Sequence, residues 1–242
     1  MPGDANTFST SNEKHLHAEL KAWLARPGDC LEESIDGYVI DLVRGDLLME
    51  VQTRSFGKLK AKLEALLPLH PVRLIYPVTL EKWIRRETAD GSLVGRRRSP
   101  KHGRVEQIFG ELAWINPVLA HPNLSVEVVL IHEEEVRRPK SGLHPWRKGW
   151  GTSERRLLAV QGMQIFARVS DLAWLLPPGL PEVFTVRDLI QPGVNRWLAG
   201  KMAYCLVRSG ATEPAGKRGR SLLYRRSPAL EIHPAVLIDQ EK

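Results

Sequence analysis

Three side chains that carry oxygen ligands, Asp41, Glu50 and Gln52, fall within a segment whose pattern predicts a β-hairpin. Residues 37–53 contain two runs of β-branched and apolar residues, and Gly45-Asp46 between them favours a tight turn. This turn places Asp41 opposite Glu50, with Gln52 pointing the same way, because side chains alternate along a strand. Opposed carboxylates repel each other, and a bound cation is the simplest compensation. Since carboxylate oxygens suit Mg²⁺ or Mn²⁺, the hairpin predicts a metal site.

The elements around this hairpin predict an α/β core with a mixed sheet. Apolar residues at helical spacing predict a helix over residues 13–25, and a second helix follows the hairpin over residues 55–69. Residues 30–35 and 72–78 are expected to be strands, the latter of the buried type. Glu19 shares a side of the first helix with Leu16 and Trp23, which would turn it toward the sheet.

The order of helix, Asp and Glu-x-Gln on adjacent strands, then a second helix, resembles the restriction-endonuclease-like PD-(D/E)XK nuclease superfamily over residues 13–78. The resemblance implies that Asp41 and Glu50 hold one or two Mg²⁺ ions and that Glu19 adds to the metal shell. It gives Gln52 the position of a lysine that positions or activates water. It therefore implies metal-dependent hydrolysis of phosphodiester bonds.

This chain departs from the family pattern at two positions. Ile40 stands where a proline precedes the aspartate, and Gln52 can orient water or ligate metal but cannot act as a base. Lys58, Lys60 or Lys62 of the next helix could supply the missing cation, although a solvated helix face is the favoured interpretation of Lys60 and Lys62.

The positive charge of the chain is concentrated near its C-terminus. The 242 residues carry a formal net charge of +7, and residues 193–226 alone hold eight basic residues against Glu213. The remainder is balanced, with 27 basic and 27 acidic residues. Such a segment predicts a surface that binds a polyanion.

Three short helices followed by a hairpin with a basic tip, over residues 170–226, resemble a winged helix-turn-helix domain. The first helix is expected over residues 170–176, and the second begins at a capping box formed by Thr185 and Asp188. The third is expected to run from an Asn195 cap to about Ser209, with Gly210 directly after it. The resemblance places the third helix in the major groove of DNA and the hairpin tip on the backbone or in the minor groove. The residues that it assigns to DNA are Arg196, Trp197, Lys201, Tyr204, Arg208, Lys217, Arg218 and Arg220.

The middle of the chain is less regular. Residues 105–114 are expected to be helical, 124–131 to be a strand, 137–151 to be a loop, and 156–169 to be a hairpin about Gly162. His132-Glu-Glu-Glu135 is interpreted as a polar strand end. The basic stretches 96–104 and 137–140 are interpreted either as tracks for phosphates or as solvated loops. The expected domains are therefore 12–155, nuclease-like, and 170–226.

Composition excludes several classes of protein. Hydrophobic residues make up 43% and charged residues 26% of the chain, as in globular proteins. No apolar run approaches the roughly 18 residues of a membrane span, and the first residues lack a signal-peptide pattern. Cys30 and Cys205 lack metal-ligand spacing, so we expect a cytoplasmic protein with reduced cysteines and no membrane partner.

Three functions remain open on the sequence. The first is a Mg²⁺-dependent nuclease acting on duplex or branched DNA, with a homodimer as one way to cut two strands. The second is a DNA-binding protein or regulator whose nuclease-like domain has lost catalysis, which Gln52 favours. The third is a nuclease directed at structured RNA.

Overall fold

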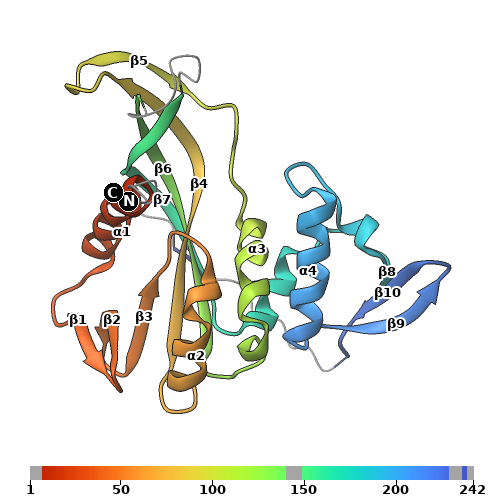
Figure 1. The fold of residues 1–242 in the computed structure, drawn as a ribbon. Helices are drawn as coiled ribbons and strands as arrows, with labels where there is room; N and C mark the ends of the chain where they lie inside the picture. Colours follow the sequence, from red (N-terminus) through yellow and green to blue (C-terminus); the bar gives the residue numbers. More distant parts are fainter. Residues whose placement is uncertain (1–6, 140–148, 229–235, 239–242) are drawn as a thin grey trace, which may run out of the picture.

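The computed structural model describes residues 7–139, 149–228 and 236–238. It is a mixed α/β structure with 29% helix and 44% strand, so the expected α/β class with a mixed sheet is confirmed. A large sheet with helices packed against it occupies the N-terminal two thirds, and a smaller helical unit with its own sheet follows (Figure 1).

Among the described residues, eight strands form the large sheet, in the order β1-β2-β3-β4-β6-β7-β11 with β5 paired to β4. The β3–β4 and β4–β6 pairs are parallel and the others are antiparallel. The strands are β1 (Cys30–Ile35), β2 (Tyr38–Arg44), β3 (Leu47–Val51), β4 (Val72–Glu87), β5 (Leu93–Arg98), β6 (Leu124–Pro139), β7 (Trp150–Phe166) and β11 (Val236–Ile238).

Helices cover both faces of this sheet. On one face, α1 (Thr7–Leu24) buries Leu16, Leu20 and Leu24 against Met49 and other residues of the strands. The opposite face is covered by α2 (Lys60–Leu66) and α3 (Ile108–Leu112), with the short 3₁₀ segments η1 (Phe56–Leu59), η2 (Val105–Gln107) and η3 (Ala113–Val118). The expected helices at 13–25, 55–69 and 105–114 are therefore confirmed, and α1 begins earlier, at Thr7.

The hairpin has the register that the sequence predicts. Arg44 pairs with Leu47 and Val43 with Leu48, so that Gly45 and Asp46 form a two-residue turn. Gly45 has a φ of +56°, a conformation that side chains disfavour and glycine adopts freely.

Three expectations for the middle of the chain were wrong. β4 and β6 each run for 16 residues, so His132–Glu135 lies inside a strand and not at its end. Gly162 lies within β7, where the register slips by one residue opposite Leu130 and Ile131, so a bulge replaces the expected hairpin turn. Residues 137–139 belong to β6; the loop predicted after them lies largely outside the described residues.

The lengthened strands build a projection that we call the arm, residues 80–98, 132–139 and 150–159. It extends beyond the helices, with β5 at its tip (Figure 1). Because β7 continues to Phe166, the sheet also reaches beyond the predicted domain end at residue 155.

The C-terminal unit contains three helical segments and a three-stranded sheet of order β8-β10-β9. Asn195 caps the longest helix through Leu198 N–H, Thr185 and Asp188 form the predicted capping box, and Gly210 follows with a φ of +77°. The elements are η4 (Val169–Leu175), β8 (Val183–Phe184), η5 (Val186–Leu189), α4 (Arg196–Arg208), β9 (Thr212–Arg218) and β10 (Ser221–Arg226).

The C-terminal unit shares its core with the α2 face of the sheet. One continuous cluster of buried side chains runs from Ile40 and Leu63 through Phe109 to Leu206 and Ala211. The two predicted domains are thus packed on each other through α3 and α4. Within the described part of the chain, no helix combines the length and the apolar character that a membrane crossing requires.

Candidate active site

The backbone hydrogen-bond ladder of the sheet is interrupted where the predicted metal ligands lie. β1 and β2 pair on both sides of Asp41, but Glu32, which faces it, has a φ of +54° and is skipped in the ladder. The β2–β3 ladder ends at Leu42 and Met49, one residue before Asp41 and Glu50. Side chains replace the missing backbone bonds: the Asp41 N–H donates to Glu50 Oε1 at 3.3 Å, and the Val51 N–H donates to Asp41 Oδ2 at 3.0 Å.

Asp41 is a carboxylate that lies between a histidine and a lysine of α1. His17 Nε2 lies 3.0 Å from Asp41 Oδ2, and Lys21 Nζ lies 3.6 Å from Oδ1. Burial disfavours the charged form, but the hydrogen bond and charge of His17, the Val51 N–H and Lys21 outweigh it and hold the pKa of Asp41 below its ordinary value. Asp41 is therefore ionised at neutral pH and turned toward α1.

Glu50 faces the other side of the sheet and pairs with a lysine of α2. Its carboxylate is only 6% exposed and accepts a hydrogen bond from Lys62 Nζ, which also donates to the Val39 carbonyl at 2.6 Å. Burial raises the pKa of Glu50, the nearby charge of Asp41 adds to that increase, and Lys62 opposes it. The solvated-face interpretation was thus wrong for Lys62, whereas Lys60 is exposed and lies 3.9 Å from Glu64.

The expected common face of the three ligands holds only in part. Gln52 follows Glu50 by two residues and so shares its side by strand alternation, and its amide Nε2 donates to the Ser55 carbonyl at 3.4 Å. Asp41 instead turns toward α1, where its carboxylate lies against His17 and Lys21 and accepts a hydrogen bond from the Val51 N–H, which the end of the β2–β3 ladder leaves unpaired with β2.

Glu19 has a different role from the one expected. Its Oε2 accepts a hydrogen bond from the Leu157 N–H of β7 at 2.6 Å. Glu19 therefore fastens α1 to the sheet, and His17 and Lys21 are the α1 residues that contact Asp41.

The donor set suits a hard cation with few protein ligands. The described residues contain no cluster of three or more His, Cys, Asp or Glu side chains that could hold a metal. Mg²⁺ is commonly bound through one or two carboxylates together with water and substrate phosphates. Glu50 and the Gln52 amide oxygen share one side of β3 and could serve in that way, whereas Asp41, which lies against α1, would have to turn to join them. Lysines already lie beside both carboxylates in this structure.

The predicted DNA-binding residues of α4 form an exposed surface next to α3 and η3. The Trp197 side chain is 62% exposed, and Lys201 Nζ lies 5.9 Å from its ring and 5.6 Å from the ring of Trp114. Arg208 reaches the side-chain oxygen of Asn116 at 3.5 Å. Arg196 and Tyr204 are exposed as well, so the helix presents aromatic and cationic groups together.

The predicted basic tip lies in the turn between β9 and β10. Ser221 pairs with Arg218, which leaves Gly219 and Arg220 as the turn, and Lys217 lies opposite Leu222. Lys217, Arg218 and Arg220 are all exposed.

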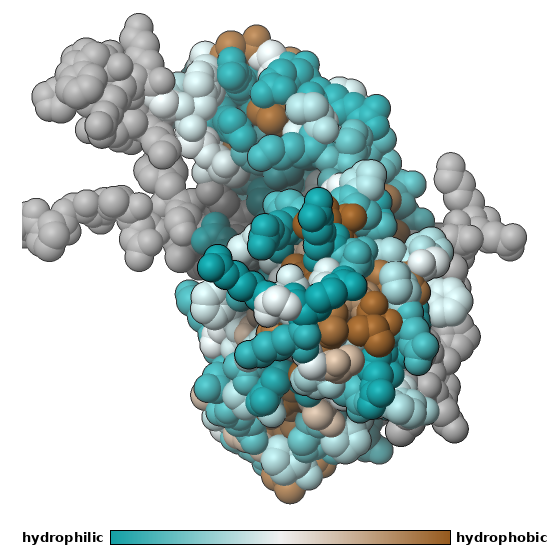
Figure 2. All heavy atoms as spheres, turned by 90° about the vertical axis from the view of Figure 1, so that its right-hand side faces the viewer, coloured by the Kyte–Doolittle hydropathy of each residue, from teal (hydrophilic) through white to brown (hydrophobic). Residues whose placement is uncertain are grey.

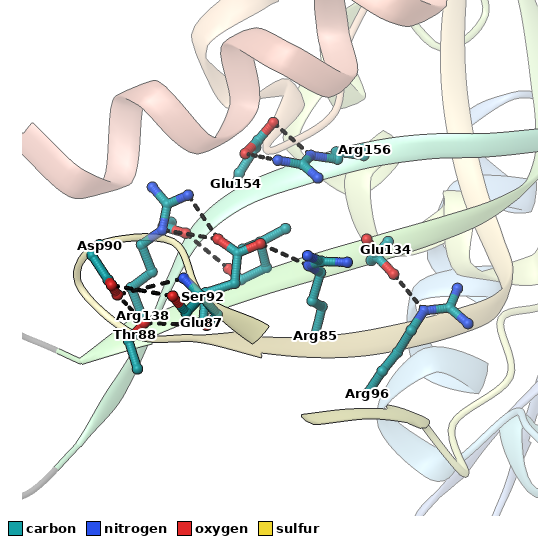
Figure 3. Close-up of polar contacts among 12 residues, drawn as sticks. Arg85, Glu87, Thr88, Asp90, Ser92, Arg96, Glu134, Arg138, Glu154 and Arg156 are labelled. Atoms are coloured by element: carbon teal, nitrogen blue, oxygen red, sulfur yellow. Dashed lines mark hydrogen bonds and ion pairs between the residues drawn. The ribbon is translucent and has the colours of Figure 1, made fainter. Parts of the chain in front are cut away.

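The arm carries a set of buried and half-buried carboxylates whose ion pairs sequence reasoning missed. Glu87 accepts hydrogen bonds from Arg85 and Arg138, Glu134 pairs with Arg96 at 2.6 Å, and Glu154 pairs with Arg156 (Figure 3). Burying a carboxylate is costly unless a cation accompanies it. The acidic run Glu133–Glu135 in β6, together with the basic residues of β4, β5 and β7, was the available sequence signal.

A family model described as "Domain of unknown function (DUF8091)" matches residues 14–167, which is more than half of the chain. The chain belongs to the DUF8091 family. A protein of Treponema pallidum (strain Nichols), described as uncharacterized, is 37% identical to this DUF8091 protein over 224 residues, covering 92% of this chain and 88% of the relative. No solved structure matches it significantly.

The DUF8091 match coincides with the large sheet. It starts inside α1 and ends one residue after β7, which finishes at Phe166. Asp41, Glu50 and Lys62 all lie within it. The similarity to the Treponema protein is longer than the family match, so it extends into the C-terminal unit.

Proposed function

We propose that this DUF8091 protein is a metal-dependent nuclease of the PD-(D/E)XK type, acting on DNA. The observation that carries the proposal is the meeting of Asp41, Glu50 and Lys62 where β2 and β3 separate. The element order supports it: α1, three antiparallel strands, α2 and then β4 parallel to β3, with α1 and α2 on opposite faces of the sheet. The order of a helix, two adjacent strands with the carboxylates and a second helix is the one that the resemblance implies.

Lys62 offers a solution to the weak point of the sequence motif. Gln52 stands where the resemblance expects a lysine, and Lys62 brings an ammonium group to Glu50 from the following helix. A cation there would stabilise negative charge that develops on the phosphoryl oxygens as water attacks phosphorus and the leaving oxygen departs. The Gln52 amide oxygen would orient the attacking water.

The two carboxylates share one task in this proposal, which is to hold Mg²⁺ or Mn²⁺. Asp41 is held ionised by His17 and Lys21 on the α1 side and would turn to join Glu50, which is paired with Lys62, when the ion binds. When bound, the ion supplies Lewis-acid charge beside the phosphodiester. Glu19 takes no part, because it is committed to the Leu157 N–H.

We also propose that the C-terminal unit is a winged helix that holds the DNA. Three helical segments followed by a hairpin, with the first short strand added beside the last in the order β8-β10-β9, support this assignment. The exposed cations of the hairpin turn and of α4 suit phosphate contacts, which are independent of sequence and sensitive to salt.

A second function, DNA binding without catalysis, is favoured by one observation. Lys62 and Lys21 already balance the charges of Glu50 and Asp41, so that the fold does not require a metal for neutrality. A DNA-binding protein with a nuclease-like fold but no cleavage would show this arrangement too.

Metal binding and cleavage separate the two functions. We expect the wild type to cut duplex or branched DNA with Mg²⁺ or Mn²⁺, and to lose cleavage in EDTA. Asp41→Asn and Glu50→Gln should each abolish cleavage and weaken Mn²⁺ binding in calorimetry. Glu19→Gln is the matched control, since a glutamine oxygen can still accept from Leu157. Cleavage that survives in Asp41→Asn would refute the nuclease assignment, and Mn²⁺ binding that is absent in the wild type would favour the second function.

A further inference from the structure

A cleft of about 800 Å³ opens between the arm and the loop that follows β5. Its lining contains six Lys and Arg side chains and a single carboxylate, Glu135. The cations come from β4, β5, β6, β7 and two loops: Arg54, Lys82, Arg97, Lys101, Arg137 and Arg155. On the side of the molecule seen in Figure 2, hydrophilic residues predominate on the arm and around the recess beneath it.

The floor of this cleft is a fixed array in which cations outnumber carboxylates. Lys82 Nζ lies 2.8 Å from Glu133 and 3.0 Å from Glu135, Arg155 binds Glu133, and Arg137 binds Glu135 at 2.7 Å. Three cations thus pair with two carboxylates, so this group of side chains has a net positive charge. The ion pairs raise the pKa of Lys82 despite its burial and lower the pKa of Glu135 to about 2, so both remain charged.

One wall of the cleft is fastened to β4. Ser99 N–H donates to the Lys82 carbonyl and Gly103 N–H to the Thr79 carbonyl, both at 2.8 Å. A Cβ on residue 103 would lie 2.4 Å from that Thr79 oxygen, so only glycine allows so close an approach. Lys101, between these anchors, is therefore presented from a fixed loop, as a preformed binding site requires.

The cleft begins where the candidate active site ends. Thr53 and Arg54 line it and directly follow Gln52. The Gln52 N–H donates to the Ile75 carbonyl, which places Gln52 beside Tyr76, another lining residue, on the same face as Glu50. A chain lying in the cleft would therefore pass the Glu50 and Gln52 side of β3.

We propose that this cleft binds consecutive phosphates of one nucleic-acid strand and leads that strand to the Glu50 and Gln52 side of the candidate active site. Cations spread over four strands and two loops suit a chain of phosphates, whereas a single small anion would need only one or two of them. The binding part of the proposal stands on the cleft alone, and its second part rests on the proposed nuclease function.

The test uses the full chain in EDTA, so that binding is measured without cleavage. Arg97→Glu with Lys101→Glu removes two exposed cations of the cleft without touching its buried ion pairs. The matched control, Arg26→Glu with Lys60→Glu, makes the same charge change at exposed positions outside the cleft. Thermal unfolding should be alike in both, and affinity for a fluorescent single-stranded dT20 and a 20-base-pair duplex is titrated against salt.

We expect the cleft variant to bind dT20 at least about tenfold more weakly than the control, with a salt slope lower by about two. An affinity and slope equal to those of the control would overturn the proposal. So would competition by inorganic triphosphate at the concentration at which unlabelled dT20 competes, since the cleft would then be a site for a small anion. If the cleft variant binds more weakly but the wild type never cleaves DNA, the cleft proposal stands and only the nuclease function is rejected.

Discussion

At the scale of single residues, the pairing of Glu50 with Lys62 sets the chemistry that this protein can perform. Burial works against the charge of Glu50, and Lys62 is the only cation that the described structure places on that carboxylate. Asp41, which the hairpin register places opposite Glu50, has its pKa lowered by His17, the Val51 N–H and Lys21. Two adjacent carboxylates with pKa values moved apart are typical of functional sites, although structural ion pairs also perturb pKa values.

Lys62→Met tests this pair directly. We expect cleavage to be lost and the free energy of unfolding to fall by about 3 kcal/mol, because Glu50 would remain buried without its cation. Lys60→Met, the same change on the exposed side of α2, should leave both properties nearly unchanged. Urea unfolding and a cleavage assay measure the two effects; equal stability of both variants would show that Lys62 does not neutralise Glu50.

At the scale of elements, the arm is a sheet extension stabilised by ion pairs. Its strands project beyond the helices that bury the rest of the sheet, so fewer apolar contacts are available there. Buried Glu87 and Glu134 are instead each bound by at least one arginine (Figure 3), and buried Glu133 is bound by Arg155. Such pairs stabilise the arm only while their carboxylates are ionised.

Acid should therefore weaken the arm through Glu135. Lys82, Arg137 and Thr152 lower its pKa from 4.5 to about 2 against the effect of burial. A lowered pKa contributes stability above the unfolded value, and this contribution is lost as the pH falls from about 4.5 to about 2. The free energy of unfolding of the wild type should fall more steeply across this range than that of Glu135→Gln. Parallel pH profiles for the two proteins would contradict the assignment.

At the scale of the whole molecule, the cleft, the candidate active site and the C-terminal unit are parts of one packed structure. The cleft adjoins Gln52 of the candidate site, and the next element, η1, packs near η3. Trp114 of η3 is 57% exposed and contacts Lys201 of α4. The shared core from Ile40 to Ala211 holds the C-terminal unit against the α2 side of the sheet. Nucleic acid bound by α4 would thus be held by a unit that is fixed relative to Glu50.

The hairpin turn of the C-terminal unit should contribute phosphate contacts to binding. Changing Lys217, Arg218 and Arg220 together to alanine should weaken duplex binding and lower the salt slope by roughly 2.7, as expected for three phosphate contacts. Arg225→Ala is a suitable control, because Arg225 lies on the same hairpin but pairs with Glu213. A slope unchanged in the triple variant would remove the hairpin from the DNA interface.

Local signals in the sequence were sufficient for the hairpin, the caps and most elements. The turn at Gly45, the Asn195 cap and the Thr185 capping box depend on residues within a few positions of each other, and all three are confirmed. The bulge at Gly162 was mistaken for a turn, because a glycine between two apolar runs suits either structure. What decided between them was the length of β6, the partner strand.

The sequence by itself determined that Asp41 and Glu50 adjoin, because a two-residue turn fixes the register of the residues beside it. Only the tertiary structure decided which charges meet them. Glu19 binds the Leu157 N–H, 138 residues away, and Lys62 reaches Glu50 from α2, the helix between β3 and β4. The cations of the cleft come together from strands and loops far apart in the chain. Such partners depend on how helices cross the sheet and how long strands align, which no spacing along the chain encodes.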